Sequence, residues 1–320
     1  MIEKRLLGQS GISVSKIALG TMYFGWKDSR ESSVERLNQY FEAGGNFIDT
    51  ANVYTRRETE GLDLYGKDFD KFEDGASEKL IGEWMREKKN RNEIVLATKV
   101  GFAYPGIKIG TSRKQIIEEC EKSLKRLKTD YIDVYYLHMD DKSTPLEESL
   151  GALTELVKDG RVRSVGLSNF TAERLLEAVC VAKREGFALP SCIQNKGTYL
   201  KPRADVDYGR QAPLDDSVIS LAKELGITPV AYSPLAKGYY AKREKGLAEC
   251  YRSAENEEKI KLLDKAAREI GVTPVQLVYA YLIQNDPSII PVAASSTREQ
   301  FCEVIGALDI SLSADFIKSL

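Results

Sequence analysis

The sequence predicts a (β/α)8 barrel, a closed ring of eight parallel strands surrounded by helices. Eight short apolar runs alternate with amphipathic helical stretches, without a break in composition. Most of these runs are almost wholly apolar, as strands are when a parallel sheet is covered on both faces. The length of 320 residues suits one barrel with insertions, because such barrels typically have about 250 residues. We therefore expect residues 1–320 to form a single barrel domain with long loops on its C-terminal face.

The strands are expected where apolar and β-branched residues cluster. A right-handed series of βα units closes into a barrel after eight repeats. Ahead of the first strand, Gly8 and Gly11 indicate a short β-hairpin outside that count. The eight expected strands lie at residues 16–20, 46–50, 93–100, 131–138, 162–167, 192–195, 228–232 and 288–292.

Helices are indicated between the strands by apolar residues at spacings of three and four. Residues 113–127 follow this pattern, and residues 171–186 repeat it with Leu175, Leu176 and Val179 on the expected buried face. The pattern therefore predicts one amphipathic helix after the third expected strand and another after the fifth.

Local capping signals define further helices. Pro145 is expected to open a helix that Gly160 ends. Thr273, Pro274 and Gln276 have the spacing of an N-cap, a first-turn proline and a capping-box glutamine. Residues 310–320 indicate a last short helix.

Three connections are too long for plain turns: residues 55–76, 199–215 and 235–255. All three follow strands, so they belong to the C-terminal face, where barrel enzymes carry their sites. Long ordered loops in compact domains are usually functional. The sequence leaves open whether they cover a substrate or form a solvated surface.

The composition argues against nucleic acid and membranes as general partners, although it leaves room for a local basic patch. Lys plus Arg is 46 and Asp plus Glu is 48, a net charge of −2, so there is no general attraction to nucleic acid or an anionic membrane. No apolar run approaches the roughly 20 residues that span a bilayer, and the N-terminus lacks a signal core. We expect a cytoplasmic protein, with an oligomeric state that the sequence does not indicate.

The cysteines and the single histidine argue against a metal site. The five cysteines are odd in number, widely spaced and without a C-x-x-C pair, which does not suit a disulfide framework or a cysteine zinc site. We expect them to be reduced packing residues. His138 is the only histidine, so a site with two or three histidine ligands is impossible, and no metal is expected.

Four polar residues stand at the ends of neighbouring apolar strands. Asp49 ends the second expected strand, Tyr54 follows it by five residues, Lys99 ends the third strand, and His138 ends the fourth. Neighbouring strands lie about 4.8 Å apart, so these side chains are expected to converge. Such a group at the C-terminal end of a barrel indicates an active site.

The chemistry of these residues suggests their roles. A lysine in an apolar strand is costly unless it is paired, and Asp49 is the expected partner that keeps Lys99 protonated. A protonated Lys99 beside Tyr54 would lower the tyrosine pKa from its usual value of about 10. Tyr54 then becomes a usable proton donor, and His138 could orient a substrate carbonyl.

The segments that carry these residues resemble the signatures of the aldo-keto reductases, and the similarity covers nearly the whole chain in the family order. Each segment alone is weak, but the combination is highly specific. The matching segments are GNFIDTANVY at 45–54, LATKVG at 96–101, YIDVYYLH at 131–138, SVGLSNF at 164–170 and AYSPLAKG at 231–238.

The resemblance implies a nicotinamide-dependent reductase that converts an aldehyde or ketone to an alcohol, or the reverse, with Asp49, Tyr54, Lys99 and His138 as its catalytic tetrad. It also implies that Tyr232 stacks on the nicotinamide ring. Further implied cofactor contacts are Gly20 and Thr21 at the ribose, Asp49, the carboxamide-binding Ser168, Asn169 and Gln194, and Ser233, Leu235, Lys237 and Gly238 along the pyrophosphate. These sites need no G-x-G-x-x-G loop, and its absence disfavours a Rossmann dehydrogenase.

The segment after the last strand departs from the family pattern. Ser295, Ser296, Arg298 and Gln300 stand where the resemblance places the adenosine 2′-phosphate and adenine, but Ser296 replaces a frequent cation and Val304 a frequent asparagine. Serine hydroxyls, helix N-terminal amides and Arg298 could still hold a phosphate. NADPH is the expected cofactor, with NADH or dual use as alternatives.

Two other functions remain open from the sequence. One is a non-catalytic nicotinamide-binding subunit or sensor on the same barrel. The other is an isomerase or lyase with a Schiff base on Lys99, which a nearby Asp49 opposes because that lysine would have to be neutral. Tyr23, Phe24 and Trp26 are candidate pocket walls. The substrate is not readable; aromatic aldehydes, sugars and small α-dicarbonyls are candidates.

Overall fold

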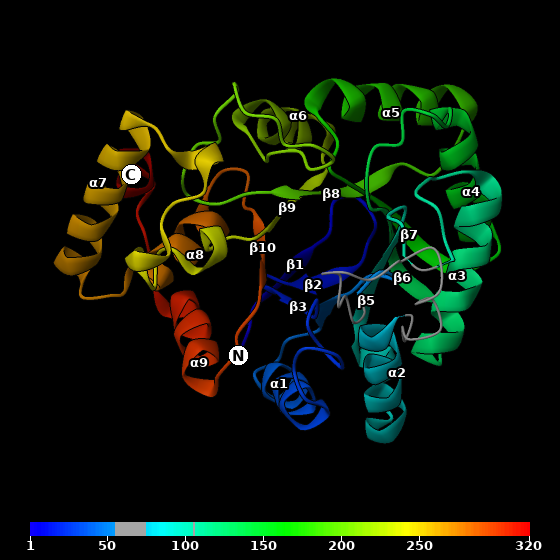
Figure 1. Cartoon of the computed structure of the whole chain (residues 1–320), viewed down its shortest axis with the longest axis horizontal. Helices are drawn as coiled ribbons and strands as arrows, with labels where there is room; N and C mark the ends of the chain where they lie inside the picture. Colours follow the sequence, from blue (N-terminus) through cyan, green and yellow to red (C-terminus); the bar gives the residue numbers. More distant parts are fainter. Residues whose placement is uncertain (55–74, 105) are drawn as a thin grey trace.

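A computed structural model describes residues 1–54, 75–104 and 106–320, and it contains the expected (β/α)8 barrel (Figure 1). Eight parallel strands form a closed ring in the order β10-β3-β4-β5-β6-β7-β8-β9. The ring follows chain order, so neighbours in sequence are neighbours in space, and all eight predicted strands are confirmed. The strands are β3 (Ala18–Gly20), β4 (Phe47–Asp49), β5 (Val95–Val100), β6 (Ile132–Leu137), β7 (Val162–Ser168), β8 (Pro190–Lys196), β9 (Thr228–Tyr232) and β10 (Ile290–Ala293).

Helices surround the ring on all sides in Figure 1. The predicted helix at 113–127 is confirmed at both ends, because the Ser112 side chain caps its start and Lys128 adopts a left-handed conformation after its end. The capping box of Thr273 and Gln276 is also present. The helices are α1 (Arg30–Glu42), α2 (Ala76–Lys88), α3 (Arg113–Leu127), α4 (Leu146–Lys158), α5 (Ala172–Glu185), α6 (Asp216–Leu225), α7 (Ala254–Ile270), α8 (Pro274–Gln284), α9 (Arg298–Gly306) and α10 (Ala314–Ser319).

One residue of α5 departs from the predicted burial pattern. Leu175 and Val179 are buried as expected, but Leu176 is 45% exposed. Consecutive residues of an α-helix are rotated by about 100°, so Leu176 points away from the face on which Leu175 and Val179 lie. The prediction that all three share one face is therefore wrong for Leu176.

The N-terminal hairpin closes one end of the barrel. Its strands, β1 (Lys4–Leu6) and β2 (Ser13–Ser15), pair in antiparallel fashion, and apolar hairpin residues such as Leu7 and Val14 pack against residues of the barrel strands. The Gly8 amide donates a hydrogen bond of 2.7 Å to Thr228 Oγ1 at the start of β9. The hairpin therefore covers the N-terminal ends of the strands.

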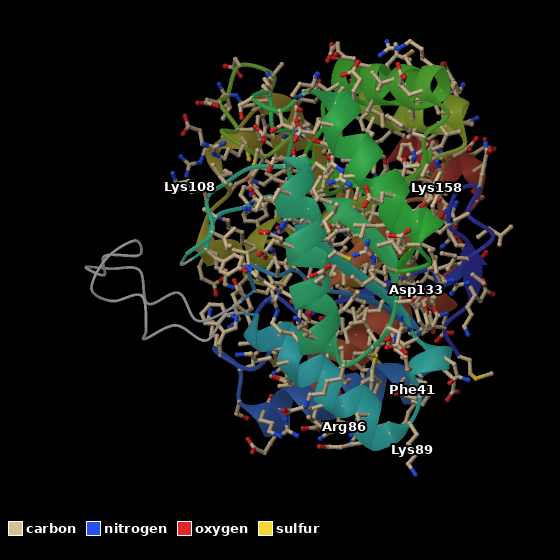
Figure 2. All side chains as sticks on the ribbon, turned by 90° about the vertical axis from the view of Figure 1, so that its right-hand side faces the viewer. Phe41, Arg86, Lys89, Lys108, Asp133 and Lys158 are labelled. Atoms are coloured by element: carbon tan, nitrogen blue, oxygen red, sulfur yellow. The ribbon has the colours of Figure 1, made fainter. Side chains whose placement is uncertain are left out.

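The two ends of the barrel can be followed in Figure 2, where the structure is turned by 90°. Lys108, in the loop after β5, lies at one end, and Asp133, at the start of β6, lies toward the other together with Lys89, which follows α2. The C-terminal ends of the strands thus open on the Lys108 side, away from the hairpin.

Two of the three long connections lie on this C-terminal face as predicted. The connection after β9 contains three short 3-10 helices, η3 (Ala236–Gly238), η4 (Arg243–Lys245) and η5 (Glu249–Tyr251). The connection after β8 is anchored by the buried Tyr199 and Leu200. Most of the third connection, residues 55–74, lies outside the described residues.

The cysteines are all free in the described residues, but they are not all packing residues. Cys120, Cys192 and Cys250 are buried, whereas Cys180 on α5 and Cys302 on α9 are exposed. The expectation of five buried cysteines is wrong for these two, because both stand on the outer faces of helices.

Two kinds of feature are absent from the described part of the chain. None of its helices is both long and apolar enough to pass through a bilayer, and its His, Cys, Asp and Glu side chains form no cluster of three or more suited to a metal ion.

Candidate active site

The four polar residues predicted from the strand ends meet at the C-terminal end of the barrel. Asp49 is the last residue of β4, Lys99 lies near the end of β5, and His138 directly follows β6. Tyr54 lies beyond β4, where its amide donates to the Ala51 carbonyl at 3.1 Å. These strands are adjacent in the ring, which brings the four residues to one place.

Lys99 is the centre of this group. Its side chain is fully buried, and its Nζ donates hydrogen bonds to Asp49 Oδ1 at 2.5 Å, to the Thr50 carbonyl at 2.7 Å and to the Tyr54 hydroxyl at 3.5 Å. Burial by itself lowers the pKa of Lys99, but the Asp49 carboxylate and Tyr54 outweigh it, so the pKa of Lys99 is raised. The lysine is therefore a fixed positive charge in direct contact with the tyrosine hydroxyl.

Asp49 is held on both of its oxygens. Oδ1 accepts from Lys99, and Oδ2 accepts from Gln194 Nε2 at 2.7 Å. The backbone carbonyl of Gln194 in turn accepts a 2.7 Å hydrogen bond from Ser168 Oγ. The Gln194 side chain, expected at the nicotinamide, is thus engaged in positioning Asp49.

His138 is 8% exposed and lies between two aromatic rings. Its ring is 6.0 Å from that of Tyr54 and 4.7 Å from that of Phe102, both edge to face. Its backbone amide donates to the Val100 carbonyl at 2.7 Å. Phe102 was missed by the sequence analysis, although its place two residues beyond β5 was a usable signal.

Asn169 connects the tetrad to the expected nicotinamide site. Its Nδ2 donates to the His138 carbonyl at 2.8 Å, and its Oδ1 accepts from the Tyr232 hydroxyl at 2.8 Å. Burial, together with the nearby Tyr54, raises the pKa of Tyr232, so Tyr232 stays a donor. Ser168 and Gln194 belong to the same hydrogen-bonded chain. The half-buried Tyr232 ring lies beside the tetrad.

Gly20 and Thr21 lie directly against Asp49. Gly20 is its partner in the β3–β4 register, and the Thr21 hydroxyl donates to the Asp49 carbonyl at 2.9 Å. Thr21 is fully buried, so its side chain holds the end of β4 in place through this hydrogen bond.

The turn after β9 carries the next group of expected cofactor residues. Ser233 and Lys237 adopt left-handed conformations, with φ of 57° and 59°, which costs a non-glycine residue roughly 1 kcal/mol or more. Such backbones cluster at ligand sites. Gly238 has a φ of 85°, and Leu235 is partly buried. The Lys237 side chain is exposed and has no salt bridge within the described residues.

The segment after β10 is held by α1 and does not contact the tetrad through any hydrogen bond in the described residues. Arg36 Nη2 donates to the Ser296 carbonyl at 3.0 Å, while Arg36 Nη1 pairs with Asp28 at 2.6 Å. The Ser296 amide donates to Gln300 Oε1 at 2.7 Å. Ser295 is partly buried, and Arg298 is exposed in the first turn of α9. Arg36 was not found from the sequence, because an arginine in an amphipathic helix normally faces solvent.

The residues expected to contact a nicotinamide dinucleotide lie at this end of the barrel. The Asn169 amide and the Ser168 hydroxyl lie close to the Tyr232 ring, and in the described residues both groups are hydrogen-bonded to the protein itself. The exposed cations Lys237 and Arg298 follow β9 and β10, and neither has a carboxylate partner in the described residues. Cations of this kind suit the phosphates of such a molecule.

Several known proteins are similar to this chain over most of its length. Residues 16–320 match the family model described as the aldo/keto reductase family. The chain is 32% identical to norsolorinic acid reductase stcV of Emericella nidulans, over 96% of this chain and 78% of that protein. It is 30% identical to the uncharacterized oxidoreductase YrpG of Bacillus subtilis, over 100% and 95% of the two chains. It is 29% identical to aryl-alcohol dehydrogenase GME11368 of Pestalotiopsis microspora, over 99% and 80%.

Proposed function

The chain belongs to the aldo/keto reductase family, an oxidoreductase family, and we propose that it reduces a carbonyl to an alcohol with Tyr54 as the proton donor. A nicotinamide cofactor, when bound, supplies the hydride. The observation that carries the proposal is the buried Lys99 Nζ between Asp49 Oδ1 at 2.5 Å and the Tyr54 hydroxyl at 3.5 Å.

Tyr54 donates its hydroxyl proton to the carbonyl oxygen of the substrate. A phenol is a weak acid, and the cost of forming a phenolate falls when a positive charge lies beside it. Lys99 supplies that charge. It remains protonated because the attraction of the Asp49 carboxylate offsets the cost of burying the ammonium group. Proton transfer from a positioned side chain is worth roughly 10²- to 10⁴-fold in rate.

His138 orients the carbonyl oxygen toward Tyr54. The imidazole lies edge to face with both Tyr54 and Phe102, and its backbone is tied to Val100 and Asn169. These contacts fix the position of its ring. A fixed donor beside the phenol limits the approach of the substrate to one in which the oxygen faces Tyr54.

We assign the cofactor to the surface from Asn169 and Tyr232 toward the segments after β9 and β10. NADPH is our first choice, because Lys237 and Arg298 are exposed cations with no carboxylate partner in the described residues. Ser296 in place of a cation is the reason to test NADH in parallel.

The substrate class we favour is an aryl aldehyde or ketone. Phe102 and Tyr54 lie around His138, and Tyr23 and Trp26 follow β3 with their ring centroids 5.7 Å apart. Aromatic walls suit a flat substrate. One relative is named as an aryl-alcohol dehydrogenase, which supports the same class.

The test is a panel of aryl aldehydes, sugars and α-dicarbonyls, followed through the loss of nicotinamide absorbance with NADPH and with NADH. The proposal expects oxidation of the cofactor that depends on the carbonyl and is fastest with aryl aldehydes and NADPH. Tight cofactor binding without turnover of any carbonyl would contradict it and favour a non-catalytic nicotinamide-binding subunit.

A further inference from the structure

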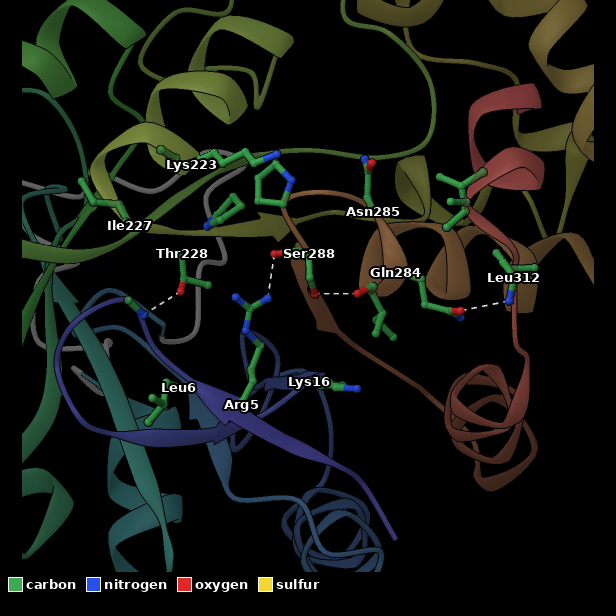
Figure 3. A pocket seen from close by; sticks show the side chains of 18 residues that line it. Arg5, Leu6, Lys16, Lys223, Ile227, Thr228, Gln284, Asn285, Ser288 and Leu312 are labelled. Carbon is green, nitrogen blue, oxygen red and sulfur yellow. Dashed lines mark hydrogen bonds between the residues drawn. The ribbon is translucent and has the colours of Figure 1, made fainter.

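A large cavity that is wide open to solvent lies at the end of the barrel opposite the tetrad. Its volume is about 900 Å³, within the range of roughly 300–1,000 Å³ that is common for small-molecule sites. The hairpin forms one wall, α6 and the start of β9 a second, and the end of α8 with the C-terminal segment a third (Figure 3). The proposed function makes no use of this end.

Three cations line the cavity: Arg5 on β1, Lys16 after β2 and Lys223 on α6. Figure 3 shows Arg5 reaching from the hairpin toward Ser288, with Lys223 on the opposite wall. No carboxylate belongs to the described lining. Arg5 has no carboxylate partner in the described residues, whereas Lys16 and Lys223 each pair with a carboxylate just outside the lining.

Arg5 is the strongest of the three anchors. Its guanidinium is half-buried, and its one hydrogen bond in the described residues runs from Nη1 to the Ser288 carbonyl at 2.8 Å. A guanidinium has five N–H donors, so most of them are left for another acceptor. Burial lowers the pKa of Arg5, which expresses the cost of holding this charge without an anion beside it.

The two lysines have partners that do not compete strongly with a ligand. Lys16 pairs with Glu3, and Lys223 pairs with Asp286 at 2.8 Å. The Glu3 and Asp286 side chains are 70% and 81% exposed. Exposed ion pairs contribute only about 0–1 kcal/mol, so both ammonium groups can still interact with an anion in the cavity.

The rest of the wall is largely aliphatic. Leu6, Ile227, Leu312 and Ile317 contribute side chains to it. Gln284 holds the C-terminal segment in place, because its Nε2 donates to the Ile310 carbonyl at 2.7 Å and its Oε1 accepts from the Leu312 amide at 3.0 Å. A ligand that fits must therefore combine an anionic group with an apolar body.

We infer that this cavity binds an amphipathic organic anion, a carboxylate or sulfonate on an apolar body. Arg5 holds the anionic group through its free donors, with Lys16 and Lys223 adding attraction. Leu312 and Ile317 contact the apolar body. This site is separate from the reductase site, and its test does not depend on turnover.

The experiment uses 8-anilinonaphthalene-1-sulfonate as the probe, titrated into the full-length protein in the presence of saturating NADP⁺ and followed by fluorescence. The neutral N-phenyl-1-naphthylamine serves as a matched probe without the sulfonate. Arg5→Gln removes the charge but keeps a donor for the Ser288 carbonyl, and Ala314→Trp fills the cavity from α10. Lys114→Gln, on an 83% exposed side chain of α3, is the control variant.

We expect one saturable site for the sulfonate. Its Kd should rise about tenfold or more in Arg5→Gln, as for the loss of a charge-assisted hydrogen bond, and should rise in Ala314→Trp as well. Lys114→Gln should match the wild type, and the neutral probe should bind more weakly. Equal affinity in wild type and both cavity variants, equal binding of the two probes, or complete displacement by NADP⁺ would each overturn the inference.

Discussion

Lys99 shows how one residue can be read correctly from sequence. A fully buried ammonium is costly unless it is paired, so its place in an apolar strand already required a carboxylate nearby. The structure provides Asp49 at 2.5 Å and adds the Thr50 carbonyl at 2.7 Å. The partner was predictable because both residues lie at the ends of adjacent strands.

Other residues of the site were not predictable in the same way. Gln194 is expected at the cofactor, and the structure adds a hydrogen bond from its side chain to Asp49 across the barrel. Arg36 donates a hydrogen bond to the carbonyl of Ser296, which lies 260 positions further along the chain. Neither contact follows from local spacing, because each depends on how the closed ring places distant segments side by side.

The contribution of Asp141 to the stability of the fold is expected to depend on pH. Its Oδ2 accepts from the Thr111 amide at 2.9 Å and from Thr144 Oγ1 at 2.7 Å, and Oδ1 accepts from the Ser143 amide at 3.0 Å. Burial opposes these hydrogen bonds, but they outweigh it and lower the pKa of Asp141 to about 2.

A carboxyl whose folded pKa lies below its ordinary value of about 3.9 stabilises the fold above that ordinary value. This contribution is lost as the pH falls from about 4 toward 2. We expect Asp141→Asn to lower the Tm at pH 6 and this difference to shrink at pH 3, measured by thermal unfolding. Asp130→Asn, at an exposed position, is the control. A Tm difference that is the same at both pH values would refute this role.

At the scale of elements, α3 was predicted in its bounds but not in its buried side. Its pattern indicated an apolar face, yet Glu119 and Arg126 are buried as well. Arg126 Nε donates to Glu78 Oε2 at 2.6 Å from α2, and Glu119 accepts from Asn52 at 2.8 Å. Periodicity assigns charged residues to solvent, so it cannot find a buried pair whose partner lies on another element.

The hairpin yields a second prediction through two glycines with similar backbones. Gly8 has a φ of +51°, and a Cβ there would lie 2.3 Å from the Ser191 carbonyl oxygen. Gly11 has a φ of +73°, with nothing within 4 Å of such a Cβ. Only Gly8 is therefore required for close approach of the hairpin to the barrel.

We expect Gly11→Ala to lower the free energy of unfolding by about 1–2 kcal/mol, the cost of a left-handed residue. Gly8→Ala should cost about 3 kcal/mol or more, because the backbone must also move. Urea unfolding at neutral pH measures both. Equal losses of unfolding free energy in the two variants would show that the backbone at Gly8 does not pack closely against β8.

At the scale of the whole molecule, the barrel was predictable because each βα unit carries its own local signals and the ring repeats them in chain order. The conformations of the long loops were not, since they depend on contacts between loops. The N-terminal cavity was also beyond the sequence. Its walls come from the hairpin, α6, α8 and the C-terminal segment, which are brought together only when the ring closes.

The molecule thus separates two tasks. The C-terminal ends of the strands gather the polar groups of the proposed proton transfer, and the hairpin packs apolar residues against the other end. This division agrees with the habit of such barrels, whose chemistry lies at the C-terminal face. Substitutions at the hairpin should therefore affect stability before they affect turnover.

The most direct test of the account compares Tyr54→Phe with Tyr131→Phe in single-turnover reduction of an aryl aldehyde. Both lose one hydroxyl, but Tyr131 lies before β6 at the opposite end of the barrel. We predict that Tyr54→Phe keeps the wild-type Kd for NADPH and loses about 10²-fold or more in rate, while Tyr131→Phe keeps both. A Tyr54→Phe rate close to that of the wild type would contradict the assignment of Tyr54 as the proton donor.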